Sequence, residues 1–224
     1  MGMSPRWLYL HGFASGPESA KGVALSGHYA RKGIHLERLN LRQPSLEHLS
    51  LSAMMRTVRE AVGGERDRAV VFGSSLGGLT ACRVAEEDAR VCALVLLAPA
   101  LRASEQMRRN VGEEGLRQWR ESGWLGTRDY AEKRETRVHF DFIRDLDAIE
   151  ARSAGWPDVR VPTLLIHGRQ DTTTDIRYSR EWARDKGHVR FVEVEDGHEL
   201  VASLERIATE ADDFLKPFLG GLTG

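Results

Sequence analysis

The chain has 224 residues, of which 41% are hydrophobic and 29% are charged. This length is sufficient for one sizeable core, and the composition is that of a globular protein. The formal net charge of −1 gives no electrostatic basis for binding nucleic acid or an anionic membrane. We find no run of about 18 apolar residues, and no signal peptide in the N-terminal segment. The sequence therefore predicts no membrane span and a cytoplasmic location.

Apolar runs in the first half of the chain predict strands that alternate with helices. Strands are expected at residues 6–10, 34–39, 69–72 and 91–97, and helices at 19–31, 46–62 and 79–85. This alternation predicts a mostly parallel, doubly wound α/β sheet with helices on both faces. We expect one such domain over residues 1–224.

The alternation breaks in the middle of the chain. Between residues 101 and 158 no convincing strand is predicted, whereas segments 105–119 and 139–151 show helical periodicity. Helices inserted at this point of a doubly wound sheet would sit where a lid is found. We therefore expect a small helical cap over residues 101–158. The alternation resumes with strands at 163–166 and 189–194, and with helices at 176–185 and 200–215.

A glycine-bordered serine follows the third predicted strand. The residues Gly73-Ser74-Ser75-Leu76-Gly77 fit G-x-S-x-G, the nucleophile elbow, in which the serine occupies a strained turn between strand and helix. Small residues are required there because the neighbouring backbone passes close to the turn. The flanking strand and helix are both predicted, so Ser75 is the candidate nucleophile. Tight packing of a glycine-rich turn is the alternative interpretation.

A serine nucleophile requires a base and a group that orients that base. Asp171 follows the predicted strand 163–166, and His198 follows the strand 189–194. All three residues would lie at the carboxyl ends of parallel strands, in the chain order Ser, acid, His. Asp175 competes with Asp171 for the acid, but it precedes a helical segment and is better interpreted as a helix N-cap.

Acyl transfer also requires hydrogen-bond donors for the developing oxyanion. The N–H of Leu76 at the start of a helix is one candidate, and the N–H of Phe13, after His11-Gly12, is the second. The region around Lys21 does not match the phosphate-binding P-loop pattern. Neither a convincing metal-ligand spacing nor a dinucleotide fingerprint is present, so no cofactor and no metal are expected.

The loop from His11 to Lys21, HGFASGPESAK, is similar to an HGF-x-S-x-P-x-S-x-K loop of small bacterial esterases. With the elbow and the order of the triad, the chain resembles an α/β-hydrolase superfamily serine hydrolase. The expected cap and the HG-x-x-D segment also resemble acyl-protein thioesterase-like members. The resemblance implies hydrolysis of a small-molecule carboxylic ester or thioester without a cofactor. The alternatives are a binding or sensor protein that uses the same pocket without turnover, and acyl transfer to an acceptor other than water.

Overall fold

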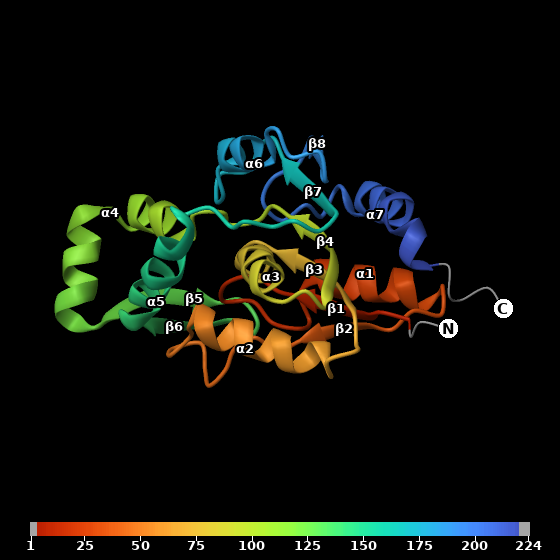
Figure 1. The fold of residues 1–224 in the computed structure, drawn as a ribbon. Helices are drawn as coiled ribbons and strands as arrows, with labels where there is room; N and C mark the ends of the chain where they lie inside the picture. The colour runs from red at the N-terminus through yellow and green to blue at the C-terminus, as the bar shows by residue number, and fades with distance from the viewer. Residues whose placement is uncertain (1–3, 220–224) are drawn as a thin grey trace.

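The computed structural model describes residues 4–219 of the chain (Figure 1). Its centre is a six-stranded sheet with the strand order β2-β1-β3-β4-β7-β8, in which every neighbouring pair is parallel. The strands are β1 (Arg6–Leu10), β2 (Leu36–Leu39), β3 (Ala69–Ser74), β4 (Val91–Leu97), β7 (Thr163–Gly168) and β8 (Val189–Val194). The expected doubly wound α/β fold is confirmed.

Helices cover both faces of this sheet, as they must when successive strands are parallel. The helices that alternate with the strands are α1 (Ala20–Ala30), α2 (Leu51–Val62), α3 (Leu76–Glu87), α6 (Ile176–Ala183) and α7 (Leu204–Leu219). Val70 and Phe72 of β3 pack in the apolar layer formed with α1 and α7, whereas Val71 packs in the layer formed with α2, α3 and α6. Strand β3 is buried along its whole length and lies between β1 and β4 in the middle of the sheet.

Helices α2 and α7 begin four to five residues later than the sequence-based expectation. Helix α2 begins at Leu51 rather than near residue 46, since the hydroxyl of Ser50 accepts a hydrogen bond from the N–H of Ala53 (3.1 Å). Helix α7 begins at Leu204 rather than near residue 200, where Leu200 has a left-handed backbone (φ 52°).

The segment 101–158 is not purely helical, and the expectation that it lacks strands is wrong. It contains α4 (Ala103–Ser122), β5 (Trp124–Asp129), β6 (Arg134–His139), α5 (Asp141–Glu150) and a short 3₁₀ helix, η1 (Ala151–Ser153). Strands β5 and β6 pair only with each other, as an antiparallel hairpin. Their charge-rich sequences show no alternation of apolar and polar residues, which explains why the hairpin is not predicted from the sequence.

The insertion gathers at one end of the molecule, away from both termini of the described chain (Figure 1). Helix α4 is kinked at Gly112, whose φ of 74° only glycine adopts readily. Beyond the kink, the indole of Trp119 donates a hydrogen bond to the carbonyl of Val138 (3.0 Å), which ties α4 to the hairpin.

Candidate active site

Ser75 occupies a strained turn between β3 and α3. Its backbone has φ 55° and ψ −120°, a conformation that is rare for a residue with a side chain. A Cβ on Gly73 would lie 2.5 Å from the carbonyl oxygen of Gly77, and a Cβ on Gly77 would lie 2.3 Å from that of Leu10. Both positions therefore require glycine, as the elbow pattern predicts.

The acid and the base lie at the same carboxyl end of the sheet. Asp171 comes three residues after β7, and His198 comes four residues after β8. The Asp171 carboxylate oxygen Oδ2 accepts a hydrogen bond from His198 Nδ1 at 2.8 Å. An Asp171 contact to Nδ1 leaves the imidazole Nε2 as the nitrogen available for proton transfer.

Three further residues, His167, Thr173 and Thr174, hold the Asp171 carboxylate. The hydroxyl of Thr174 donates to Oδ2 (2.7 Å), and His167 Nε2 lies 3.1 Å from the same oxygen. The N–H groups of Thr173 and Thr174 donate to Oδ1, each at 2.8 Å. Burial of the carboxylate acts to raise the pKa of Asp171, but the hydrogen bonds from His167, His198 and Thr174 outweigh it and lower the pKa well below its usual range. Asp171 is thus a buried, permanently charged carboxylate at neutral pH.

The competing carboxylate, Asp175, serves a different purpose. It is the N-cap of α6, and its side chain accepts a hydrogen bond from the N–H of Arg177 (3.0 Å). The Arg177 side chain also binds this carboxylate and lowers the pKa of Asp175 to about 2. The interpretation of Asp175 as a helix cap therefore agrees with its contacts.

Thr174 connects the acid loop with the turn beside Ser75. Its hydroxyl lies 3.2 Å from His198 Nδ1 and 3.4 Å from the carbonyl oxygen of Ala98, just beyond β4. The preceding residue, Leu97, accepts a hydrogen bond from the backbone N–H of Ser75 (3.0 Å). Ser75, Asp171 and His198 therefore surround the end of β4.

The loop after β1 lies against Ser75. A Cβ on Gly12 would lie 3.1 Å from the Cβ of Ser75 and 3.6 Å from its Oγ. The buried side chain of His11 shapes this loop: its Nδ1 donates to the carbonyl of Gly12 (2.9 Å), and its Nε2 accepts from the N–H of Leu41 (3.1 Å). Burial lowers the pKa of His11, which favours the neutral ring that these two bonds require.

The two candidate oxyanion donors, the N–H groups of Phe13 and Leu76, belong to the residues that follow Gly12 and Ser75, which lie close together. Leu76 is the first residue of α3, where backbone N–H groups have no partner within the helix. Phe13 follows Gly12, and its ring stacks on that of Phe142 with ring centres 5.4 Å apart. Over residues 4–219 the structure records no backbone acceptor for the N–H of Phe13 or of Leu76.

The insertion contacts the loops of the site at several points. The N–H of Tyr130 in the hairpin donates to the carbonyl of Ala14 (2.9 Å), next to the oxyanion loop. Near the start of α4, the side-chain oxygen of Gln106 accepts from the N–H of Asp175 (2.9 Å). These contacts, with the Phe142 ring from α5, place the insertion beside the loops that follow β1 and β7.

Three residues at the site are not predicted from the sequence: Thr174, described above, His167 and Lys21. His167, which precedes Gly168 at the end of a predicted strand, binds Asp171 directly and also contacts the hydroxyl of Ser179 (2.8 Å). Its place four residues before the acid was the available signal. Lys21 was considered only as a phosphate ligand, yet its Nζ donates to the carbonyls of His198 and Glu199. No signal links Lys21 to residues 177 positions away.

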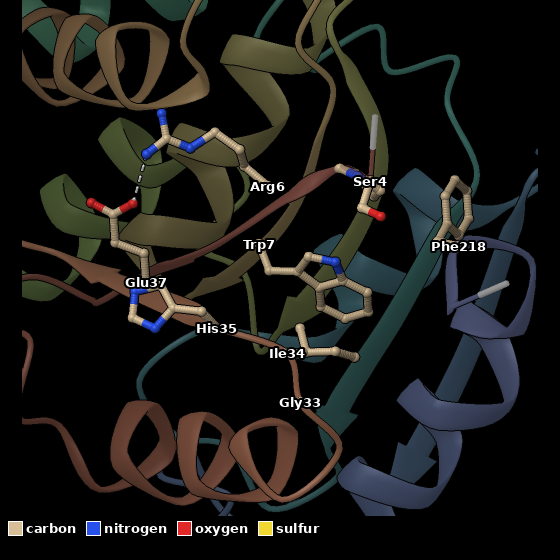
Figure 2. A pocket seen from close by; sticks show the side chains of 9 residues that line it. Ser4, Arg6, Trp7, Gly33, Ile34, His35, Glu37 and Phe218 are labelled. Atoms are coloured by element: carbon tan, nitrogen blue, oxygen red, sulfur yellow. Dashed lines mark hydrogen bonds and ion pairs between the residues drawn. The ribbon is translucent and has the colours of Figure 1, made fainter. Parts of the chain in front are cut away.

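A separate cavity of about 260 Å³ lies near the amino end of β1, at the opposite end of the sheet from Ser75 (Figure 2). Arg6 and Glu37 form an ion pair on its wall (3.2 Å), and the ring of Trp7 lies between this pair and Phe218. None of the candidate catalytic residues lines it.

Within residues 4–219, no cluster of three or more His, Cys, Asp or Glu side chains could hold a metal ion. The same part of the chain contains no helix that is long and apolar enough to cross a membrane.

Taken together, the parallel sheet, the strained serine turn and the helical layers define an α/β-hydrolase fold. Solved structures agree over nearly the whole chain. A putative hydrolase from Agrobacterium vitis S4 matches with a TM-score of 0.81 and 18% identity, covering 96% of this chain and 90% of its own. Alpha/beta hydrolase domain-containing protein 10 from mouse matches with a TM-score of 0.78 and 18% identity (97% and 92% coverage). Est1E from Butyrivibrio proteoclasticus matches with a TM-score of 0.74 and 20% identity (98% and 90% coverage).

The chain belongs to the family described as "Uncharacterised protein family (UPF0227)", which matches residues 6–215. No curated protein matches the sequence. The low identities to the solved structures make the fold the common property, and the chemistry has to be argued from the residues of this chain.

Proposed function

We propose that the protein is a serine hydrolase that cleaves a carboxylic ester or thioester through an acyl-enzyme intermediate. The observation that carries the proposal is a strained elbow serine at the same end of the sheet as a hydrogen-bonded acid–base pair, in which the acid is buried. Ser75 has φ 55°, and Asp171 accepts a hydrogen bond from His198 at 2.8 Å. Structural neighbours such as Est1E share the fold and support this class of activity by analogy.

The reaction follows from the roles of these groups. Ser75 Oγ attacks the acyl carbonyl carbon while His198 Nε2 takes its proton, and the Asp171 carboxylate stabilises the imidazolium that forms. The N–H groups of Leu76 and Phe13 hold the oxyanion. His198 then gives the proton to the departing alcohol or thiol. Water, activated by the same imidazole, hydrolyses the acyl-enzyme and regenerates the serine.

We further propose that residues 101–158 act as a cap that lines the acyl side of the site. The stacked rings of Phe13 and Phe142 support this, because they pack the insertion against the loop that bears a candidate oxyanion donor. The substrate class is a small-molecule acyl ester or thioester, handled without a cofactor. The expected cytoplasmic location is part of the same proposal.

Labelling with a fluorophosphonate, followed by intact-mass spectrometry, tests the nucleophile. We expect a single adduct on the wild type and on Ser74→Ala, which removes the neighbouring buried serine, and no adduct on Ser75→Ala. Hydrolysis of p-nitrophenyl acetate should fall by about 10⁴-fold or more in Ser75→Ala, as it does when a triad serine is removed.

Two results would contradict the proposal. Wild-type turnover in the Ser75→Ala variant would remove Ser75 from the chemistry. A folded wild-type protein that forms no adduct and turns over no ester would favour the alternative of a small-molecule binding protein on the same fold.

A further inference from the structure

A buried ammonium group lies beneath the loop that carries His198. Lys21, in the first turn of α1, has a side chain that is only 7% exposed. Its Nζ donates to the carbonyl oxygens of Glu199 (2.9 Å) and His198 (3.3 Å), and it lies 3.6 Å from the Glu199 carboxylate. Burying a lysine charge is costly unless hydrogen bonds compensate for the lost water. Burial lowers the pKa of Lys21, whereas the Glu199 carboxylate acts in the opposite direction.

The start of α1 is held rigidly against the sheet, so the position of this ammonium is well defined. Ser19 caps the helix and accepts a hydrogen bond from the N–H of Gly22 (3.4 Å). A Cβ on Gly22 would lie 2.7 Å from a ring carbon of Tyr9 in β1. Helix α1 therefore begins in direct contact with β1, the strand that leads into the His11-Gly12 loop.

Few other hydrogen bonds hold the backbone of the loop that carries His198. Asp196 fixes its two ends: the Asp196 carbonyl accepts from the N–H of Gln170 (3.0 Å), and its carboxylate accepts from that of Ser203 (2.9 Å). Over residues 4–219 the structure records no donor other than Lys21 for the carbonyls of His198 and Glu199. Leu200, the next residue, has a left-handed backbone.

We propose that Lys21 is a positioning residue for the catalytic base. By binding two successive carbonyls, its ammonium fixes the backbone of residues 198–199, and this keeps His198 Nδ1 on the Asp171 carboxylate. Lys21 thereby couples the helix that follows the oxyanion loop to the loop that carries the base. The inference rests on the proposed hydrolase function, which it deepens.

The test compares Lys21→Met, which keeps the length of the side chain but loses its charge and donors, with Lys21→Gln, which keeps one donor group. Lys32→Met is the matched control, because Lys32 lies just beyond the other end of α1 and pairs with Asp212. Each variant is measured for kcat and KM on p-nitrophenyl acetate and for its melting temperature. The proton NMR spectrum of each variant is also recorded without substrate. The signal of interest is the downfield resonance of the His198 Nδ1 proton, which is assigned by its loss in His198→Gln.

Lys21→Met is expected to lower kcat by about tenfold to a hundredfold, the range for a misplaced catalytic group, with little change in KM. The Nδ1 resonance should broaden or vanish. Lys21→Gln should fall between this variant and the wild type, and Lys32→Met should match the wild type in kcat and in the resonance.

A folded Lys21→Met protein with wild-type kcat and an intact resonance would overturn the proposal, as would a change in KM alone. If Lys21→Met does not fold, wild-type values of both readouts in Lys21→Gln overturn it. Failure of the proposed function is separable: it would appear as absent turnover and labelling in the wild type. The substrate-free resonance would then still decide whether Lys21 holds the imidazole.

Discussion

The absence of a side chain at Gly12 leaves space beside the Ser75 hydroxyl. A Cβ on Gly12 would stand 3.1 Å from the Ser75 Cβ, which is closer than nearly all real Cβ contacts. The neighbours cannot easily yield, because Ser75 is fixed in its strained turn and His11 binds both Gly12 and Leu41. Gly12 is therefore required by the close approach of two loops.

A Gly12→Ala substitution should displace the loop that bears the Phe13 N–H. We expect kcat for p-nitrophenyl acetate to fall by about tenfold to a hundredfold, because an oxyanion donor acts only at the correct distance. Steady-state kinetics and the rate of fluorophosphonate labelling measure the effect.

Gly27→Ala is the control for Gly12→Ala. At Gly27, within α1, the nearest atom to an added Cβ lies 3.8 Å away. This variant should keep wild-type kcat and gain about 0.5–1 kcal/mol of stability from the better helix propensity of alanine. Equal kinetics in Gly12→Ala and Gly27→Ala would show that the loop after β1 does not position a catalytic donor.

Among the elements of the chain, the insertion depends on contacts at its base, where α4 begins and α5 ends. The N–H of Ser104 donates to the Glu150 carboxylate (3.3 Å), and the Ser104 hydroxyl binds Asp147. Glu150 is 7% exposed. Burial raises the pKa of Glu150 to about 7, although the nearby Arg83 and backbone N–H groups act against the shift and Asp147 adds to it.

This raised pKa predicts that the base of the insertion loses stability as pH rises. The pKa of an unfolded glutamate is about 4.3, so the contribution of Glu150 is fully present below that pH. It is lost as pH rises through the folded value of about 7, where a charge must be buried. Glu150→Gln should therefore match the wild type near pH 4 and exceed its free energy of unfolding near pH 8.5.

Urea unfolding at the two pH values measures the difference. Glu113→Gln, at an exposed position of α4, is the control and should show no such pH-dependent gain. A Glu150→Gln protein whose stability tracks the wild type at both pH values would exclude a titrating Glu150 at the base of the insertion.

For the molecule as a whole, the insertion and the sheet share one of two apolar layers. Ile143 of α5 is fully buried in the layer that contains Leu8 of β1 and Val71 of β3. Ile207 of α7 is fully buried in the layer on the other face. We propose from this shared core that the described residues 4–219 unfold as a single cooperative unit.

Ile143→Val and Ile207→Val test this unit. Each should lower the free energy of unfolding by about 0.5–1.5 kcal/mol, and the double variant should lose the sum, since the two sites lie on opposite faces of the sheet. Unfolding should remain a single transition when followed by both far-UV circular dichroism and tryptophan fluorescence. A separate early transition in Ile143→Val would instead define the insertion as an independent domain.

Sequence alone determined the features that depend on local pattern. Buried parallel strands are continuous apolar runs, so β1, β3, β4 and β7 are recognisable in the sequence. The glycines around Ser75 predict the strained turn that the structure contains. The order of Ser75, Asp171 and His198 followed from their places after strands. These signals are strong because strand burial and tight turns restrict which residues can occupy each position.

Only the tertiary structure decided the features that depend on contacts between distant residues. The hairpin of β5 and β6 carries charge-rich strands without alternation, and its pairing depends on Trp119 and on neighbouring loops. The roles of His167 and Lys21 depend on which oxygens lie within reach after folding. A hydrogen bond between side chains or carbonyls far apart in the chain leaves no periodicity in the sequence, because its geometry exists only when the layers have packed.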